Sequence, residues 1–261
     1  MKQAKEKYSI QAVENALEVL EQFKGKRAEL GISEISRALG LQKNNVFRLL
    51  ATLEAKGYVE QNPNNESYRL GIRALELGKA FLSHTGLIRV AQERIRLLSS
   101  QVEETVYLGI MKDARVYYVE DAESSQPLRV ASRIGTRLSP LCTAMGKVML
   151  AFYEENERER IIGLNHFVRH LPNTIMDPQE FRHHLTEIRE QGWALDNEEM
   201  DPGVICVAAP VRDYEERIVA AVSISGPATR IVKPAIEEKL LPRLKECCFE
   251  ISRAIGFSGG L

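Results

Sequence analysis

The sequence SEISRALGLQKNNVFRLLATLEAKGYV, residues 33–59, predicts two short helices joined by a tight turn. Ser33, placed before an acidic residue, suits a helix N-terminus in capping and in charge, and Gly40 ends this helix. Apolar residues of the second helix recur at i, i+3, i+4 and i+7; they are Val46, Leu49, Leu50 and Leu53. Gly57 follows where a left-handed C-terminal cap is expected. Two helices joined through a short glycine-containing turn are typical of a helix-turn-helix, here about residues 33–56.

The polar residues of the second helix are of the kinds that bind DNA. If the apolar stripe packs inward, the opposite face presents side chains near the helix start, where recognition helices read base edges. Asparagine can form two hydrogen bonds with adenine, whereas lysine and arginine bind phosphate or guanine. The predicted DNA-contacting residues are Lys43, Asn44, Asn45 and Arg48.

The segments on either side suggest a winged helix. Upstream, apolar residues at i, i+3, i+7 and i+10 predict one packed face of a first helix; they are Ile10, Val13, Leu17 and Leu20. Downstream, Tyr58–Glu60 and Tyr68–Leu70 flank a polar stretch that contains Pro63, which predicts a hairpin. A helix-turn-helix followed by a hairpin is a winged helix. The alternative is a small helical bundle in which Asn44 and Asn45 are merely solvated.

Charge differs in sign between the two parts of the chain. Residues 1–85 hold 13 basic and 10 acidic residues, a net charge of +3, whereas residues 86–261 hold 22 and 26, a net charge of −4. The mild N-terminal excess permits contact with phosphates but does not by itself identify it. The 261 residues, 44% hydrophobic and 27% charged, have the composition of a soluble globular protein of one large or two modest domains.

The composition also argues against a membrane, secreted or metal-binding protein. No window approaches the ~18 consecutive apolar residues of a membrane span, and the charged start is not a signal peptide. The four cysteines form no CxxC pair, which fits a reduced cytoplasm. His166 and His170 are spaced i, i+4, as zinc ligands on a helix can be, with His183 and His184 nearby. Solvated histidines are the plainer interpretation, and we expect no metal and no cofactor.

From residue 72 onwards the sequence predicts a linker helix and then an α+β domain. Ile72, Leu75 and Leu82 share one helix face, with no proline or Gly/Ser run between them. Strands are predicted at Thr105–Ile110, Val116–Glu120, Leu128–Ile134, Val204–Val211 and Ile218–Ser225. Helices are predicted near Leu87–Leu98, at Ala144–Phe152 and Phe181–Arg189, and from Ile236 to Ile255, where Pro242 lies near the first turn or marks a kink. This irregular alternation indicates an α+β domain.

Two short motifs in this part have the chemistry to hold a small anion. Residues 143–147 open a helix with small side chains, which leaves backbone N–H groups near the surface where the helix dipole favours a carboxylate. Small residues serve close packing equally well. Ser223 and Ser225 lie at i and i+2, so both hydroxyls face one side of a strand, where neighbouring backbone could satisfy them. By themselves, Cys206 is a small buried hydrophobe and Asp196 belongs to a solvated turn.

Four separated blocks of the chain, in the same order, resemble the IclR family of bacterial transcription regulators. The first comprises EISRALGL (34–41), VFRLLATLEAKGYV (46–59) and YRLGIRALELG (68–78); the others are SRIGTRLSPLCTAMGKVMLA (132–151), ALDNEEMDPGVICVAAPV (194–211) and AAVSISGP (220–227). The resemblance covers residues 10–256. It implies a winged helix-turn-helix DNA-binding domain over residues 1–71, a linker helix over 72–85 and a GAF-like effector-binding domain over 86–261.

The resemblance also implies an effector pocket. The positions that line it in the family are here Ala144, Met145, Asp196, Cys206, Ser223 and Ser225. Backbone N–H groups and serine hydroxyls can hold a carboxylate, and Asp196 can accept a ligand hydroxyl. The likeness is nearest to sugar-acid regulators, so the implied effector is a small carboxylate such as a keto acid or sugar acid. The chain departs from the family at Asn44 and Asn45, where short hydroxyl residues are usual, which implies a different operator.

These observations predict a cytoplasmic, ligand-responsive transcription regulator of a catabolic operon. We expect a homodimer, or a tetramer built from two dimers, on near-palindromic double-stranded DNA with half-sites roughly 34 Å apart. We expect repression, although the position of the operator determines whether such a regulator represses or activates transcription.

Two alternatives carry less weight. Residues 256–260 match the GxSxG pattern of serine hydrolases but lack a following helix and a downstream histidine, so we expect no enzyme. The second alternative is a ligand sensor whose N-terminal domain binds protein instead of DNA. A steep weakening of duplex binding with salt would argue against it, because counterion release requires phosphate contacts.

Overall fold

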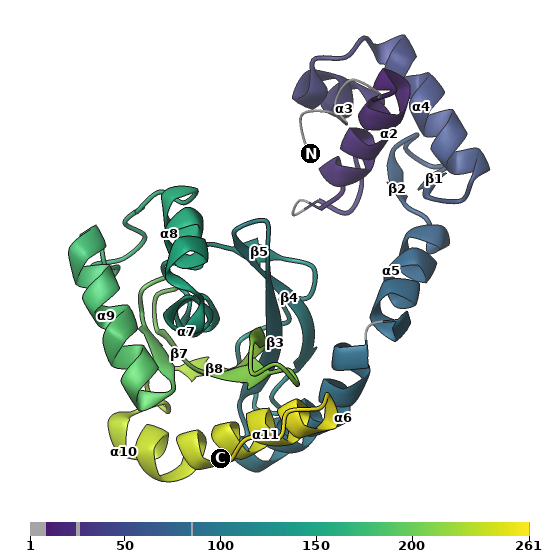
Figure 1. Ribbon diagram of the computed structural model, residues 1–261. Coiled ribbons are helices and arrows are strands. Elements are labelled where there is room, and N and C mark those ends of the chain that lie inside the picture. The colour runs from purple at the N-terminus through teal and green to yellow at the C-terminus, as the bar shows by residue number, and fades with distance from the viewer. Residues whose placement is uncertain (1–8, 25–26, 85, 261) are drawn as a thin grey trace. The chain divides into compact units, whose positions relative to one another are not determined.

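The computed structural model describes residues 9–24, 27–84 and 86–260, with residues 79–84 described by their backbone. The chain divides into two compact units, Met1–His84 and Thr85–Leu261. Figure 1 labels their helices and strands. The first unit is mainly helical, and the second combines helices with an antiparallel sheet, which is the α+β class that the sequence predicts.

The first unit contains the predicted helix-turn-helix, hairpin and following helix. Its elements are α2 (Gln11–Gln22), α3 (Ile32–Leu39), α4 (Lys43–Ala55), β1 (Val59–Gln61), β2 (Tyr68–Leu70) and α5 (Ile72–His84). β1 and β2 pair antiparallel and carry the polar segment between them as the tip of a wing. The helix predicted over residues 72–85 is α5; residue 85 and the Leu82 side chain lie outside the described part of the chain.

The core of this unit lies between its first three helices and the hairpin. Val19, Ile35, Val46 and Leu50 are buried there. The predicted stripe of the first helix is wrong in part, because Ile10, Val13 and Leu17 are exposed. A second set of apolar residues in this segment has the same helical spacing and faces α4 instead; it comprises Ala16, Val19, Leu20 and Phe23.

The helix ends agree with the sequence at the glycines and differ at the first cap. Gly40 at φ +67° and Gly57 at φ +74° adopt the left-handed backbone that terminates α3 and follows α4. Ser33 is not the cap of α3, which begins at Ile32. Gly31 takes that position, and its N–H donates to Glu34 Oε2 at 2.9 Å.

The second unit is built on a six-stranded antiparallel sheet. Its strands are β3 (Thr105–Lys112), β4 (Arg115–Ala122), β5 (Arg137–Leu138), β6 (Ala194–Asn197), β7 (Val204–Arg212) and β8 (Ile218–Pro227). Their order across the sheet is β5-β4-β3-β8-β7-β6. β3, β8 and β7 are central and supply most of the buried residues of the sheet.

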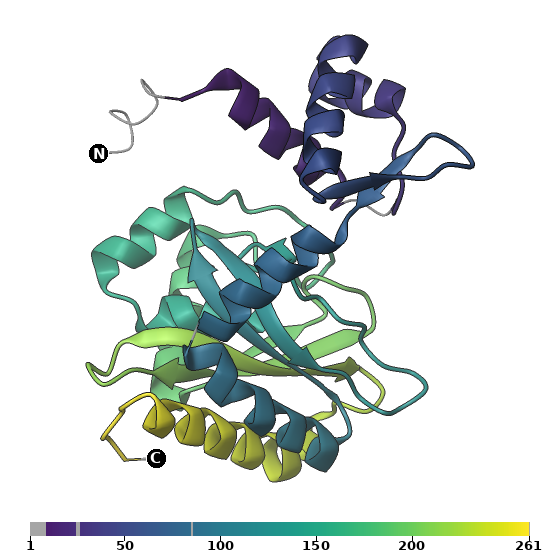
Figure 2. The ribbon, with the colours of Figure 1, turned by 90° about the vertical axis from the view of Figure 1, so that its right-hand side faces the viewer.

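Helices cover both faces of the sheet. One face, called here the α7 face, packs against α7 (Ala144–Phe152); α9 (Pro178–Gln191) packs on α7, and α8 (Glu155–Gly163) lies on the same side (Figure 1). The other face packs against α6 (Gly86–Val102) and α11 (Leu241–Ala254), which lie side by side in Figure 2. Among the strands and helices of this unit as far as β8, those not predicted from the sequence are α8, β5 and β6.

The strand predicted at Leu128–Ile134 is wrong. Residues 123–136 form an irregular loop over the α7 face, called here the cover loop, before the short β5. Side chains of β3, and not a neighbouring strand, hold this loop. Thr105 Oγ1 donates to Val130 O at 2.8 Å, and the Tyr107 hydroxyl donates to Ala131 O at 2.5 Å. A β-branched sequence therefore lies on the sheet face without pairing within the sheet.

The C-terminal helix contains the predicted irregularity at its proline. α10 (Lys233–Ala235) continues through a π-helical stretch, η1 (Ile236–Leu240), into α11. Pro242 occupies the first turn of α11, where its missing N–H is tolerated. The first-turn alternative is confirmed, and α11, which carries Pro242, directly follows the π-helical stretch.

Candidate DNA-binding and effector sites

The turn before α4 is fixed by local hydrogen bonds. Leu41 N–H donates to Ser36 O at 3.1 Å, and the Ser36 hydroxyl donates to Leu41 O at 2.6 Å. Val46 and Leu50 anchor one face of α4 in the core. The side chains on its other face are exposed, and they include the four predicted DNA-contacting residues, Lys43, Asn44, Asn45 and Arg48.

Phe47 is a residue of this surface that the sequence analysis did not single out. Its side chain is 51% exposed, although it lies between the buried Val46 and the predicted contact Arg48. A concave surface of about 540 Å³ joins the start of α3, the start of α4 and the wing; it is lined by Gly31, Ile32, Ser33, Lys43, Asn44, Phe47, Gln61, Asn65 and Glu66. An aromatic ring at a recognition helix can contact a thymine methyl group. The i, i+3, i+4 spacing from Val46 shows that residue 47 faces outward, so the sequence contained this signal.

Glu29 holds the tip of the wing. Its carboxylate accepts hydrogen bonds from the Asn62 and Asn65 side-chain amides and from the Ser67 hydroxyl, at 2.6 to 3.2 Å. These bonds, that of Asn65 foremost, lower the pKa of Glu29 from 4.5 to about 2. The polar residues of the wing are therefore held in one arrangement at neutral pH.

The predicted effector residues share one face of the sheet. Asp196 on β6 pairs with Cys206 on β7, which pairs with Ser225 on β8. In the next row Ser223 pairs with Ala208 on β7 and with Tyr107 on β3. Directly opposed residues of antiparallel strands point to the same side, so all of these side chains lie on the α7 face.

The first turn of α7 lies over the same face. A Cβ atom added to Gly109 on β3 would lie 2.8 Å from Met145 Sδ, so Met145 packs directly on the sheet. The Thr143 hydroxyl caps the helix by accepting the Gly146 N–H at 3.3 Å. The expectation that this turn lies near the surface is wrong, because Ala144 and Met145 are buried. The cover loop and the segment 198–203 enclose it.

Asp196 is a buried carboxyl group and not part of a solvated turn. Its Oδ1 accepts the Glu199 N–H at 2.8 Å. Burial and the neighbouring Glu199 carboxylate raise the pKa of Asp196 from 3.8 to about 7. Burial also raises the pKa of the Cys206 thiol, so the thiol remains protonated at neutral pH. At neutral pH this row can therefore both donate and accept hydrogen bonds.

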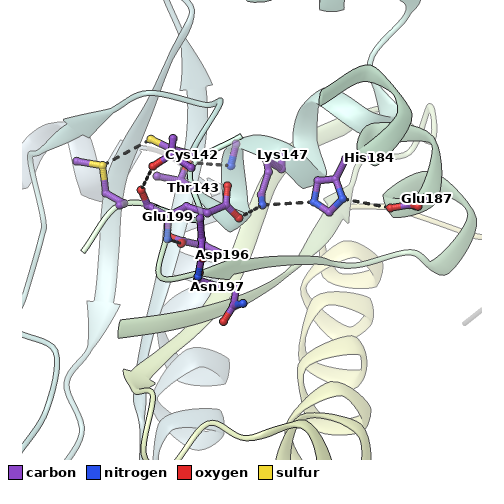
Figure 3. Close-up of polar contacts among 12 residues, drawn as sticks. Cys142, Thr143, Lys147, His184, Glu187, Asp196, Asn197 and Glu199 are labelled. Atoms are coloured by element: carbon purple, nitrogen blue, oxygen red, sulfur yellow. Dashed lines mark hydrogen bonds and ion pairs between the residues drawn. The ribbon is translucent and has the colours of Figure 1, made fainter. Parts of the chain in front are cut away.

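A row of buried and half-buried charged side chains beside Asp196 was not identified from the sequence. The fully buried Lys147 of α7 forms an ion pair with Glu199, and its Nζ lies 3.4 Å from His184 Nε2 on α9 (Figure 3). His184 Nδ1 in turn lies 3.2 Å from Glu187. Burial and the Lys147 charge lower the pKa of His184. Within the described residues, Glu199 Oε2 is buried without a hydrogen-bond partner.

A second ion pair joins the cover loop to the segment 198–203. Arg133 of the cover loop donates through Nη2 to Asp201 Oδ2 at 2.6 Å. Next to Asp201, Met200 Sδ lies 3.5 Å from Cys142 Sγ, just before the start of α7. Arg133 and Asp201 could not be selected from the sequence, because loop charges are usually solvated.

The comparisons with known proteins agree with this architecture. The profile of the bacterial transcriptional regulator IclR C-terminal domain matches residues 79–253, and that of the IclR helix-turn-helix domain matches residues 12–63. The chain belongs to the IclR family. It is a DNA-binding transcription regulator and not an enzyme, as its named relatives are regulators.

Two relatives and one solved structure illustrate the likeness to IclR proteins. The chain is 36% identical to the HTH-type transcriptional regulator XynR of Escherichia coli over 248 residues, 95% of this chain and 98% of XynR. It is 34% identical to KdgR of the same organism over 233 residues, 89% and 88% of the two chains. A crystal structure of a transcriptional regulator from Rhodococcus sp. RHA1 has a TM-score of 0.86 at 30% identity and covers 95% of this chain and 98% of its own.

The structure does not support the metal site or the hydrolase motif considered in the sequence analysis. His166 and His170 lie in a loop, where their i, i+4 spacing does not place them on one helix face. In the described ranges no three His, Cys, Asp or Glu side chains are grouped as metal ligands. Residues 256–260 follow α11 and no strand, so they do not form a nucleophile elbow. None of the helices in the described part of the chain combines the length and hydrophobicity that a bilayer crossing needs.

Proposed function

We propose that this IclR protein regulates a catabolic operon in the cytoplasm and responds to a small carboxylate that carries a keto or hydroxyl group. The observation that carries the proposal is the shared placement of the predicted effector residues on the α7 face. The backbone of Ala144 and Met145, beside the hydroxyls of Ser223 and Ser225, supplies donors for a carboxylate. Asp196 and Cys206 supply partners for a second polar group of the ligand.

The DNA side of the proposal rests on α4. Lys43, Asn44, Asn45 and Arg48 are exposed together on the helix that follows the turn, as a recognition helix requires. We assign residues 1–71 to DNA binding, residues 72–85 to the linker and residues 86–261 to effector binding. A near-palindromic operator follows if two copies bind together, each in one half-site.

A homodimer is supported by apolar surface on the first unit. On α2, Ile10, Val13 and Leu17 are exposed along one stripe, and on α5 Ile72 and Leu75 are exposed. Each of these side chains has more than half of its surface in solvent. Exposed apolar stripes of this size mark interaction surfaces in soluble proteins. Assembly of two dimers into a tetramer remains compatible with this arrangement.

Isothermal titration calorimetry with a panel of small keto, hydroxy and sugar acids tests the effector assignment. We expect at least one acid to bind the parent protein, and we expect Ser223→Ala and Asp196→Ala each to weaken that binding about tenfold or more. Ser100→Ala is the matched control, since it removes an exposed hydroxyl on α6. Equal binding by all four proteins would place the ligand elsewhere, and absence of binding by every acid would remove the carboxylate assignment.

A further inference from the structure

An ion pair joins two loops at the α7 face. The cover loop is attached to β3 through the Thr105 and Tyr107 hydroxyls described above. The facing loop, residues 198–203, follows β6 and carries Asp201. Arg133 and Asp201 join the two at 2.6 Å, with side chains 23% and 37% exposed. The pair is therefore half-buried at the rim of the candidate effector site.

Arg133 lies on the part of the cover loop that is held against the α7 face, because the Ala131 carbonyl accepts from the Tyr107 hydroxyl at 2.5 Å and the Gly135 N–H donates to the Tyr118 carbonyl at 2.9 Å. The positive charge of Arg133 acts on the pKa values of Tyr107, Tyr118 and Cys206, all of which lie on the α7 face. Cys206 belongs to the row that contains Asp196 and Ser225. A ligand that occupies this row therefore lies on the sheet face that the part of the cover loop with Arg133 overlies.

Asp201 pairs with Arg133 through a carboxylate group, and a ligand carboxylate can form the same ion pair. In the described part of the chain, the ion pair with Asp201 is the only one that Arg133 forms. A guanidinium group binds carboxylates in a fixed planar geometry, and it is the protein group best suited to select a carboxylate over a neutral amide. Replacing the Asp201 carboxylate by that of a ligand preserves the charge balance around Arg133. Both residues lie in loops and not in the sheet, so exchange of partners needs no change in strand pairing.

We propose that Arg133 pairs with the carboxylate group of the effector, alongside the α7 backbone and the serine hydroxyls, and that Asp201 is the partner of Arg133 when no effector is bound. The inference rests on the proposed function and refines it by naming the residue that distinguishes an acid from its neutral analogue. Asp201 is then a competitor for the ligand, so the two partners of one ion pair have opposite effects. Loss of Arg133 weakens acid binding, whereas neutralisation of Asp201 strengthens it.

Calorimetry with lactate and lactamide, at millimolar concentrations, tests this exchange directly. We expect Asp201→Asn to bind lactate several-fold more tightly than the parent does, because Arg133 is then unpaired. We expect Arg133→Gln, and the double variant R133Q/D201N, to bind lactate about tenfold more weakly than D201N. Lactamide should bind the four proteins equally. Arg129→Gln is the matched control, since Arg129 forms an exposed ion pair with Glu123 in the same loop.

Each outcome separates the inference from the function on which it rests. Lactate binding to D201N that is no tighter than to the parent, or binding that R133Q leaves unchanged, overturns the exchange. If Ser223→Ala abolishes lactate binding to D201N while R133Q does not, the effector site stands and the role of Arg133 is wrong. If Ser223→Ala has no effect and R133Q does, the acid binds at Arg133 but outside the proposed site. Thermal unfolding of each variant shows that it is folded.

Discussion

Asp196 shows how burial changes the chemistry of a single residue. The sequence DNEE at positions 196–199 is typical of a solvated turn, yet the structure pairs Asp196 with Cys206 inside a sheet. The placement could not be predicted from composition, because it depends on pairing of β6 with a strand that comes later in the chain. The family resemblance selected Asp196, whereas its raised pKa required the fold.

The raised pKa of Asp196 predicts a stability that depends on pH. Because its pKa in the folded protein, about 7, exceeds the ordinary 3.8, the charged carboxylate destabilises the fold as pH rises between these values. Asp196→Asn should therefore raise the free energy of unfolding, relative to the parent, by about 1–3 kcal/mol more at pH 8 than at pH 5. Urea denaturation at both pH values measures it. Asp177→Asn, at the exposed cap of α9, is the control, and an equal effect of Asp196→Asn at both pH values would refute the shift.

Gly146 decides between the two interpretations of the small residues at the start of α7. A Cβ atom there would lie 2.3 Å from Pro140 Cα, so this glycine serves close packing of the helix on the preceding turn. Gly146→Ala should destabilise the protein by about 1–3 kcal/mol in chemical denaturation. Gly163→Ala is the matched control, since a Cβ on Gly163 meets nothing within 4 Å. Equal stability of the two variants would show that the packing at residue 146 is loose.

At the scale of elements, the periodic helices and the central strands were predictable and the covering loop was not. α4 follows from apolar residues at helical spacing, whereas β7 and β8 follow from short β-branched apolar runs bounded by turns. The segment Leu128–Ile134 has the composition of a strand, but its carbonyl groups accept hydrogen bonds from side chains of β3. The prediction of the buried stripe of α2 was wrong for a different reason. Two sets of apolar residues in that helix have the same period, and only the position of the neighbouring helices determines which set is buried.

The α7 helix carries a buried lysine that its sequence presents as a solvated charge. Lys147 and Glu199 neutralise each other in the interior. Lys147→Met should destabilise the protein by about 3–5 kcal/mol, because it leaves Glu199 buried without a counter-charge. The double variant K147M/E199L should recover most of this loss in chemical denaturation.

The matched control for this pair is an exposed one on α8. Arg160 forms an ion pair with Glu157 at 2.7 Å, with both side chains about half exposed. Arg160→Met should change the free energy of unfolding by less than about 1 kcal/mol. If Lys147→Met costs no more than Arg160→Met, the interior pair does not stabilise the fold.

At the scale of the whole molecule, the exposed stripes of α2 and α5 predict how copies associate. Leu17→Glu combined with Leu75→Glu places charges on both stripes and should raise the dissociation constant of the dimer about tenfold or more. Sedimentation velocity measures the dissociation constant. Leu164→Glu, a change at an exposed leucine after α8, is the control. A double variant that remains as dimeric as the control would place the dimer contact on another surface.

The central claim is that binding of a small acid on the α7 face changes the affinity of α4 for DNA. In this account the dimer has one arrangement that binds the operator and one that does not. By linkage, an effector that binds these two arrangements with different affinity also shifts operator affinity. The most direct measurement is fluorescence anisotropy of a duplex selected by the purified protein, titrated with and without the acid found by calorimetry, alongside Ser223→Ala. We predict that the acid changes operator affinity about tenfold in the parent and leaves it unchanged in Ser223→Ala. Operator affinity that does not respond to an acid bound at this site would contradict the account.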